Sequence, residues 1–280
     1  MIEGALIVWY LLTAASIVFM IYDLATNTPA MGVMKAAWVL ITLYLGPVGL
    51  FIYLLSCRQP LPGTHDAFIA AHWKQSTGSL AHCLAGDATG IILGALLTYR
   101  FGFPNGIDLI IEYTAAFLFG WMIFQALFMR SMLGGDYTLA LRKTFFAEFV
   151  SMNMVMVGMI PAMVILMHAP PESRNPLHPL FWGVMSLATL AGGFTAYPIN
   201  SWMVRLGIKH GMMSAPRKVV PATTGMKMPG MAMPMPASGG MHAHRAIPMS
   251  LARQATIVAL TLAALAAAVW LTAHVAPIRL

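Results

Sequence analysis

The chain has 280 residues, of which 59% are hydrophobic and 9% are charged. A soluble domain carries about 25% charged residues, so this composition excludes an ordinary soluble protein and indicates an integral membrane protein. Basic loops facing an anionic membrane surface explain the net charge of +7, which therefore gives no reason to expect a nucleic-acid partner. The sequence has no nucleophile elbow, nucleotide-binding loop or zinc-protease motif, and we predict that it is not an enzyme.

Seven apolar stretches are long enough to cross the hydrocarbon core, which takes about 20 residues of helix. The sequence thus predicts an all-α fold, a polytopic helical membrane protein with about seven transmembrane helices. We expect Gly46 and Pro47 to bend the second span. The predicted spans are residues 4–22, 33–55, 79–100, 107–129, 145–167, 180–204 and 255–275.

Changes in composition divide the chain into five parts. A two-helix amino-terminal region (1–56) is followed by a polar connector (57–78) and a four-helix membrane core (79–212). A loop rich in Met, His and Pro (213–250) then leads to a carboxyl-terminal transmembrane helix (251–280). The loop has no helix or strand periodicity, so we expect disorder in the absence of a ligand.

The distribution of basic residues predicts how the chain is oriented. The loops after the second, fourth and sixth predicted spans carry twelve Lys and Arg residues, and the opposite side carries four. By the positive-inside rule, the amino terminus and the Met-rich loop should be cytoplasmic and the carboxyl terminus outside. We therefore predict a multi-pass protein of the bacterial cytoplasmic (inner) membrane, with the lipid bilayer as its partner.

The third predicted span contains three residues with chemistry, His82, Cys83 and Asp87. At about 100° per residue they share one face of the helix. These side chains are of the types that bind transition metals, so they form a candidate metal site that lacks a fourth ligand. An ionisable group within a span is costly and is a functional candidate by itself. Asp87 could therefore also carry a proton, or it could be protonated and hydrogen-bonded.

The same face carries a ladder of small residues. Gly86, Gly90 and Gly94 recur every four residues, and such a pattern lets a neighbouring helix approach closely. The face therefore predicts tight helix packing. It also offers a surface for a homo-oligomer.

Methionines form a stripe along the fifth predicted span. Together with Glu148 and Met167, they occupy an arc of about 100° on the helix. Thioether sulfur suits Cu(I), so the stripe could pass a soft cation along the helix. Methionine is also a flexible apolar filler, and the stripe could simply be a packed face. The candidate ligands of the stripe are Met152, Met156, Met159 and Met163.

A second enrichment in methionine and histidine lies in the long loop before the last span. A flexible chain with nearly alternating methionines can wrap a soft cation, although a neutral Pro-rich linker has a similar composition. In a reducing cytosol, thiolates bind Cu(I) better than methionines do. The loop residues proposed as metal ligands are Met228, Met231, Met233, Met235, Met241, His242 and His244.

Two glutamates in the spans also have simpler interpretations. Glu112 lies near the outer end of its predicted span and is expected to reach toward the membrane surface. Glu148 lies near the cytoplasmic end of the fifth span and is expected to pair with Arg142 or Lys143.

Several motifs together resemble a known bacterial membrane family. They include the stretch Ala-His-Cys-Leu-Ala-Gly at 81–86, the stretch Tyr-Pro-Ile-Asn-Ser-Trp at 197–202, and Gly-Ile-Lys-His at 207–210. Asp23 and the Leu-Tyr-Leu-Gly-Pro stretch at 43–47 add to the likeness. These stretches resemble domain of unknown function 4396. The resemblance covers roughly the first three quarters of the chain, and it implies a membrane fold without a settled activity.

The combined patterns lead to three hypotheses. The first is a copper-related integral membrane protein, a permease or a metal-handling accessory factor with Cu(I) as its predicted ion. The second is a proton- or ion-coupled transporter of another solute that uses Asp87. The third is a non-enzymatic membrane assembly or scaffold protein.

Overall fold

The computed structural model describes the chain except residues 1, 169, 216–248, 277 and 279–280. Within the described residues, the protein is helical and contains no β-strand, which confirms the predicted all-α polytopic membrane-like fold. Six helical segments are long and apolar enough to cross a membrane. They are α1 (Ile2–Thr26), α5 (His72–Phe101), the continuous segment α6 (Asn105–Leu118), η1 (Phe119–Gln125) and α7 (Ala126–Arg130), then α8 (Tyr137–Leu166), α9 (Pro179–Arg205) and α10 (Leu251–Val275).

The second predicted span is a hairpin of two short helices, α2 (Gly32–Leu45) and α3 (Pro47–Ser56), and not a transmembrane helix. Gly46 adopts a φ of 56°, which favours glycine, and Pro47 starts the next helix without a backbone N–H. The chain reverses there, and α3 then packs so closely on α2 that a Cβ added to Gly49 would lie 2.9 Å from the Ile41 carbonyl oxygen. The second of the seven predicted spans is therefore replaced by a helical hairpin, which leaves six.

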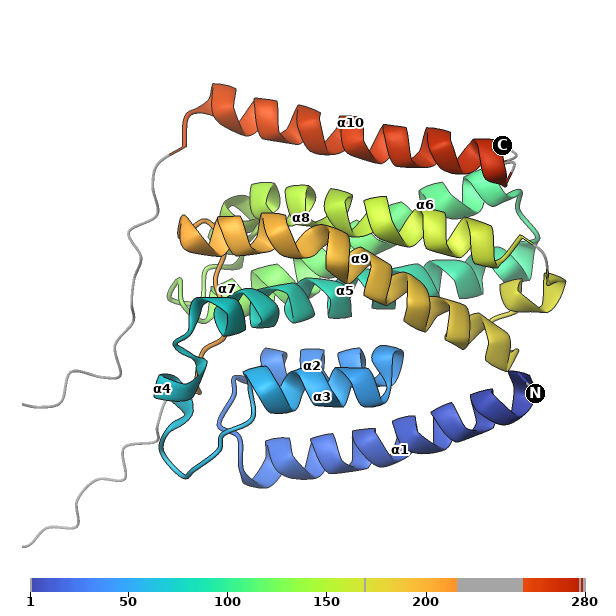
Figure 1. Cartoon of the computed structure of the whole chain (residues 1–280). Coiled ribbons are helices and arrows are strands. Elements are labelled where there is room, and N and C mark those ends of the chain that lie inside the picture. The colour runs from blue at the N-terminus through green and yellow to red at the C-terminus, as the bar shows by residue number, and fades with distance from the viewer. Residues whose placement is uncertain (1, 169, 216–248, 277, 279–280) are drawn as a thin grey trace, which may run out of the picture.

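This hairpin is held inside the protein. It lies between α1 and α5 (Figure 1). Trp38 and Tyr53 have no exposed surface and pack edge to face at 5.5 Å. Backbone that does not span the membrane is tolerated at membrane depth where protein surrounds it, and this packing supplies that cover.

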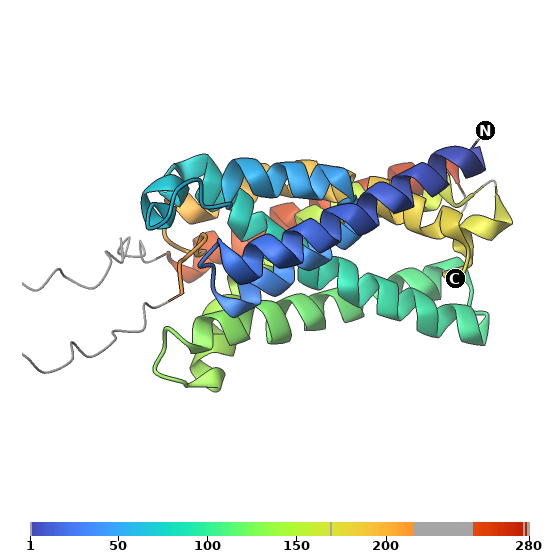
Figure 2. The same cartoon turned by 90° about the horizontal axis from the view of Figure 1, so that it is seen from below.

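The hairpin changes the predicted orientation of the amino terminus. Because the hairpin enters and leaves at the same end of the bundle, α1 begins at the end opposite to the one where α9 stops and α10 starts (Figures 1 and 2). We call the end where α1 begins and α10 stops the terminal end, and the other end the basic end. The prediction that α1 begins on the side where α9 stops and α10 starts is therefore wrong, and the assignment of either end to the cytoplasm stays a prediction. Because the chain reverses within the second predicted span, the segment before that span lies at the opposite end of the bundle from the one predicted.

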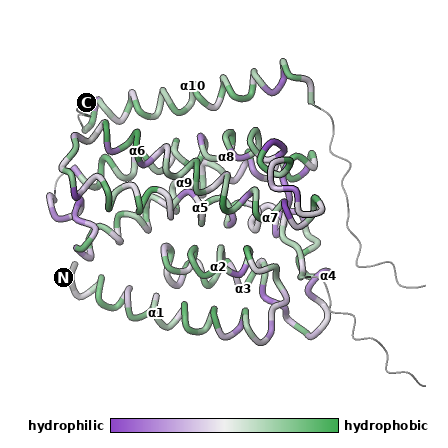
Figure 3. The backbone as a smooth tube through the Cα atoms, turned by 180° about the vertical axis from the view of Figure 1, so that it is seen from behind, coloured by the Kyte–Doolittle hydropathy of each residue, from purple (hydrophilic) through white to green (hydrophobic). Residues whose placement is uncertain are grey.

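Basic residues of the described chain are concentrated at the basic end. By the positions of their helices, nine lie there and two, Arg100 and Arg174, lie at the terminal end. Colouring by hydropathy shows the same concentration of hydrophilic residues around α4 (His65–Ile69) and α7 (Figure 3). The nine are Lys35, Arg58, Lys74, Arg130, Arg142, Lys143, Arg205, Lys209 and Arg253.

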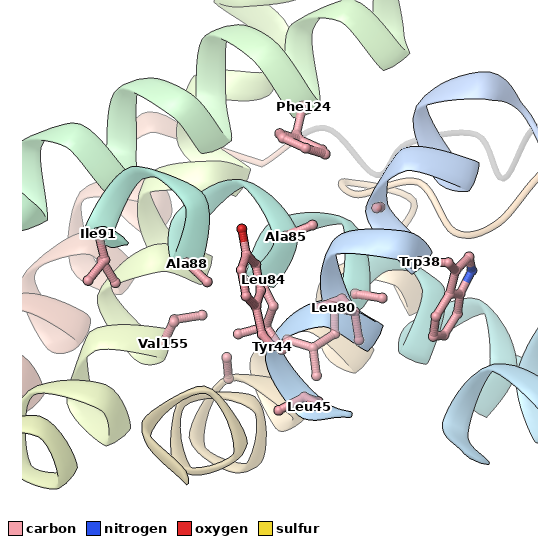
Figure 4. Packing of buried hydrophobic residues seen from close by; sticks show 14 of the residues in the cluster. Trp38, Tyr44, Leu45, Leu80, Leu84, Ala85, Ala88, Ile91, Phe124 and Val155 are labelled. Carbon is pink, nitrogen blue, oxygen red and sulfur yellow. The ribbon is translucent and has the colours of Figure 1, made fainter. Parts of the chain in front are cut away.

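Helix α5 is the centre of the bundle. In its most apolar stretch, 78% of the residues are buried inside the protein, compared with 17% in the corresponding stretches of α1 and α10. Leu84 and Ile91 of α5 pack together with Tyr44 of the hairpin and Val155 of α8 (Figure 4). The helix at the centre of the bundle thus carries the residues that the sequence had marked for chemistry.

Candidate functional site

The glycine ladder of α5 packs against the α6–η1 segment of the same chain. A Cβ on Gly86 would lie 2.7 Å from Gly120 Cα, and one on Gly94 would lie 3.0 Å from Glu112 Cα. Such distances require the absence of a side chain, which confirms the predicted close helix approach. Because α6 and η1 already cover Gly86, Gly90 and Gly94, a second copy of the chain cannot use this face as expected.

A π-helix lies opposite the ladder. Residues Phe119–Gln125 form η1 within an otherwise α-helical segment. A π-helical turn changes the direction in which the following side chains point, and such turns occur frequently at functional sites. Here η1 carries Gly120, which contacts α5, and Gln125, whose buried side chain points into the bundle.

Five buried residues meet beside η1, and we call them the ionic cluster: Cys83, Asp87, Gln125, Glu148 and Lys209. The Cys83 thiol donates to Glu148 Oε2 at 2.9 Å. Gln125 Nε2 donates to the same oxygen at 2.9 Å and lies 3.4 Å from the Cys83 sulfur. Lys209 Nζ donates to the Cys83 sulfur and forms an ion pair with Glu148 Oε2 at 3.6 Å.

The lysine reaches the cluster from outside the spans, in the segment 206–215 that follows α9. Its side chain is 2% exposed, and its ammonium also donates to Asn200 Oδ1 at 2.7 Å. Asn200 in turn donates to Ser151 Oγ at 2.8 Å. Burial lowers the pKa of the Lys209 amine, but Cys83 and Glu148 raise it by more, so the net direction is upward. The ion pair with Glu148 favours the charged form of the amine at this buried position.

Three carboxylate oxygens of the cluster accept no hydrogen bond from the described residues. They are both oxygens of Asp87 and Oε1 of Glu148. Asp87 Oδ1 and Glu148 Oε1 lie against the same point, the Cα of Gly120, where an added Cβ would overlap both. One unpartnered oxygen of Asp87 and one of Glu148 thus face one spot deep in the bundle.

His82 does not join this cluster. Its ring packs edge to face on Phe124 at 5.8 Å and on Phe128 at 5.0 Å. The predicted shared face of His82, Cys83 and Asp87 is therefore wrong for the histidine, because an arc of about 140° is wide enough to meet two different neighbours. Across the described residues, no three His, Cys, Asp or Glu side chains form a group that could hold a metal ion.

The methionine stripe lies in the hydrophobic core. Met152, Met156, Met159 and Met163 are all buried in the main cluster of apolar side chains. A Cβ on Gly192 of α9 would come 2.6 Å from Met159 Cγ, so the stripe packs directly against that helix. This arrangement fits the packed-face interpretation, and Cu(I) binding by the stripe stays a prediction.

The methionines and histidines of the long loop, from Met228 to His244, lie outside the described residues. Their role as metal ligands also stays a prediction.

Both simple interpretations of the glutamates are wrong. Glu148 is fully buried and pairs with Lys209, not with Arg142 or Lys143. Glu112 is 7% exposed and lies against α5, so it does not reach the membrane surface.

Sequence reasoning missed Lys209, which was counted only as a loop charge. It also gave Gln125 no role. One signal for Lys209 was present, because the residue belongs to the Gly-Ile-Lys-His stretch at 207–210 that contributed to the family resemblance. Nothing local marks Gln125 beyond its polarity within an apolar run.

Fold and site together define a class: an all-α polytopic membrane-like protein with an ionic cluster at its centre. Residues 72–209, just under half of the chain, match the family model described as Domain of unknown function (DUF4396), and this match supports the resemblance of the segment to that family. The match begins at the start of α5 and ends at Lys209, so it contains the whole cluster. Helix α1 and the hairpin lie outside it, which makes the likeness shorter than expected. No curated protein and no solved structure matches the chain.

Proposed function

We propose that the protein is a proton-coupled membrane transporter in which Asp87 and Glu148 form the proton-binding site. The observation that carries the proposal is a pair of buried carboxyl groups that face one spot: neither oxygen of Asp87 has a hydrogen-bond partner among the described residues, and neither has Oε1 of Glu148. Ionisable groups within membrane spans are costly and mark ion pathways and proton relays.

The charges of the cluster favour a titrating site. Lys209 provides one positive charge for two carboxyl groups. A low-polarity interior strongly disfavours the remaining negative charge. The cluster becomes neutral when one carboxyl group carries a proton or when a cation binds beside Gly120. Protonation and cation binding would therefore compete at this site.

The position of Lys209 suggests how binding could be coupled to movement. The segment 206–215 runs back over the basic end and contacts the connector. Ser214 Oγ lies 2.6 Å from His65 Nδ1 and donates to Asp66 Oδ1 at 2.5 Å. A change of charge on Glu148 or Asp87 alters the attraction that holds the lysine in place. The segment that carries the lysine is thus the natural candidate for the part that moves.

Two measurements on the reconstituted protein test this proposal. Infrared difference spectra across about pH 5 to about pH 9 should show a protonated-carboxyl band that Asp87→Asn removes. Vesicles that contain a pH-sensitive dye should show proton flux that depends on an added solute, and the same variant should lose it. Asp136→Asn is the matched control, because Asp136 is exposed and Asn retains its capping of α8. Solute-dependent proton flux that persists in Asp87→Asn would contradict the proposal.

A copper-related function is the second candidate, and one observation favours it. The Cys83 thiol lies 2.9 Å from a Glu148 oxygen, and Met152 lies one turn farther along the same face of α8. Thiolate and thioether are the ligands that Cu(I) prefers. Cu(I) titration against a competing chelator should then show weaker binding for Cys83→Ala combined with Met152→Leu. Equal affinity in the wild type and this variant would exclude Cu(I) binding at the bundle centre.

A further inference from the structure

A second pair of carboxyl groups lies on α6, nearer the terminal end. Glu112 lies within a membrane-spanning segment, and its side chain is buried, with 7% of its surface exposed. It forms no ion pair or hydrogen bond with any described residue. Asp108 lies one turn closer to the terminal end, is half-buried, and leaves Oδ1 without a partner.

The glycine ladder connects this pair to the ionic cluster. Gly94 packs on Glu112, and Gly86 packs on Gly120, where the Asp87 and Glu148 carboxyl groups lie. Glu112 and Gly120 are eight residues apart, or about 12 Å along a helix. Both acidic pairs therefore lie on one helix interface, at different depths.

Polar side chains occupy the levels between them. The Tyr113 hydroxyl, next to Glu112 on α6, donates to Asn153 Oδ1 at 2.7 Å. Asn153 is fully buried and lies five residues beyond Glu148 on α8. A hydroxyl can accept one proton while it gives up another, and an amide can orient water molecules by hydrogen bonds, so these side chains could support a water-mediated proton relay between the two depths.

The neighbours of Glu112 leave it without a countercharge. On α6, the nearest ionisable groups are Asp108, which has the same charge sign, and Tyr113. On α5, Gly94, which carries no side chain, packs against Glu112. Arg174 of η2 (Pro171–Arg174) acts on Asp108, at the solvent side of the pair. A buried carboxyl group in such surroundings is stable when it carries a proton.

We propose that Glu112, with Asp108 at its solvent side, is a second proton-binding site that exchanges protons between the Asp87–Glu148 pair and the terminal end. The inference rests on the proposed function and adds the route by which protons reach the cluster from that end. The ligand is the proton itself.

Infrared spectroscopy of the full chain in vesicles tests this site separately from the cluster. Glu112→Gln should lose a protonated-carboxyl band that Asp87→Asn retains. Transfer into heavy water shifts the bands of exchangeable carboxyl groups, and the Asp87 band should shift more slowly in Glu112→Gln. Asp108→Asn should slow the shift of the Glu112 band. Glu172→Gln is the control, because Glu172 is an exposed carboxylate at the same end.

The outcomes separate the two proposals. If Glu112→Gln keeps every band and the wild-type exchange rate, the second site is wrong and the cluster stands. If Glu112→Gln removes a band but Asp87→Asn removes none, Glu112 binds a proton and the proposed function fails. Glu112→Asp guards against misfolding, because it restores a carboxyl group and should restore a band. A folded Glu112→Asp protein without that band would also overturn the inference.

Discussion

Two buried aspartates, Asp23 and Asp87, have opposite surroundings. Asp23 lies where α1 meets the base of the hairpin, and it accepts from Arg58 Nε at 2.8 Å, Thr28 Oγ1 at 2.9 Å and the Tyr53 hydroxyl at 2.5 Å. Asp87, at the centre of the bundle, accepts from no described residue. A buried carboxylate whose oxygens accept hydrogen bonds from several donors stabilises the fold. A buried carboxyl group without donors is instead a candidate site for a proton or another cation.

The comparison also separates two ion pairs. The Arg58 side chain is 42% exposed, and its pKa is raised mainly by the hydrogen bond to Asp23. The Lys209 side chain is 2% exposed, and its partner Glu148 is fully buried. Water screens the first pair and not the second. Removing one partner should therefore have very different consequences in the two regions.

The largest effect is expected for Lys209→Met. This change leaves Glu148 buried without its countercharge, which should lower the free energy of unfolding by about 3–5 kcal/mol. Adding Glu148→Gln should restore much of the loss, because the buried charge is then also removed. Melting curves in detergent of both single variants and the double variant measure the coupling. A strictly additive double variant would show that the ion pair does not hold segment 206–215 in place.

A smaller loss is expected for Asp23→Ala. The variant leaves the buried Tyr53 hydroxyl and Thr28 without their acceptor, which should cost about 2–3 kcal/mol. The protonated-carboxyl band assigned to the cluster should stay unchanged, since Asp23 is saturated with donors. Asp23→Asn keeps an acceptor oxygen and should be milder. Loss of that band in Asp23→Ala would break the distinction between a structural and a functional aspartate.

The smallest effect concerns His65, which contacts Ser214 at the basic end. Burial is the main reason that the pKa of His65 is lowered from its usual value. The unfolded chain then binds more protons than the folded protein, so stability should fall as the pH drops below about 6.5. His65→Asn should reduce the loss of melting temperature between about pH 7.5 and about pH 5.5 by a few degrees. An unchanged pH profile in His65→Asn would contradict this assignment.

Much of the fold could be predicted because membrane helices follow from local composition. The apolar runs gave six of the seven predicted spans correctly in kind, and Gly86, Gly90 and Gly94 predicted a close helix contact. The hairpin was missed although Gly46 and Pro47 were recognised as a break. A bend and a full reversal have the same local sequence, and only the cover supplied by α1 and α5 makes the reversal stable.

Two of the five residues of the ionic cluster were predicted as site residues. Cys83 and Asp87 stand out in an apolar helix, because cysteine and aspartate are chemically distinctive there. Their partners Glu148 and Lys209 are 65 and 126 residues from Cys83 along the chain. A glutamate near a helix end and a lysine in a loop look like surface charges until the chain is folded.

The sequence by itself determined that this protein is helical, apolar enough for a membrane, and equipped with an ionisable residue within its most central span. Composition and periodicity are sufficient for those conclusions, because burial in lipid requires long apolar helices whose backbone hydrogen bonds are satisfied internally. Tertiary structure decided which charges meet. It folded α3 back against α2, it placed Gly120 against Asp87 and Glu148, and it buried the Lys209 side chain in the ionic cluster. These contacts depend on the packing of helices that are far apart in the sequence, which short stretches of sequence do not determine.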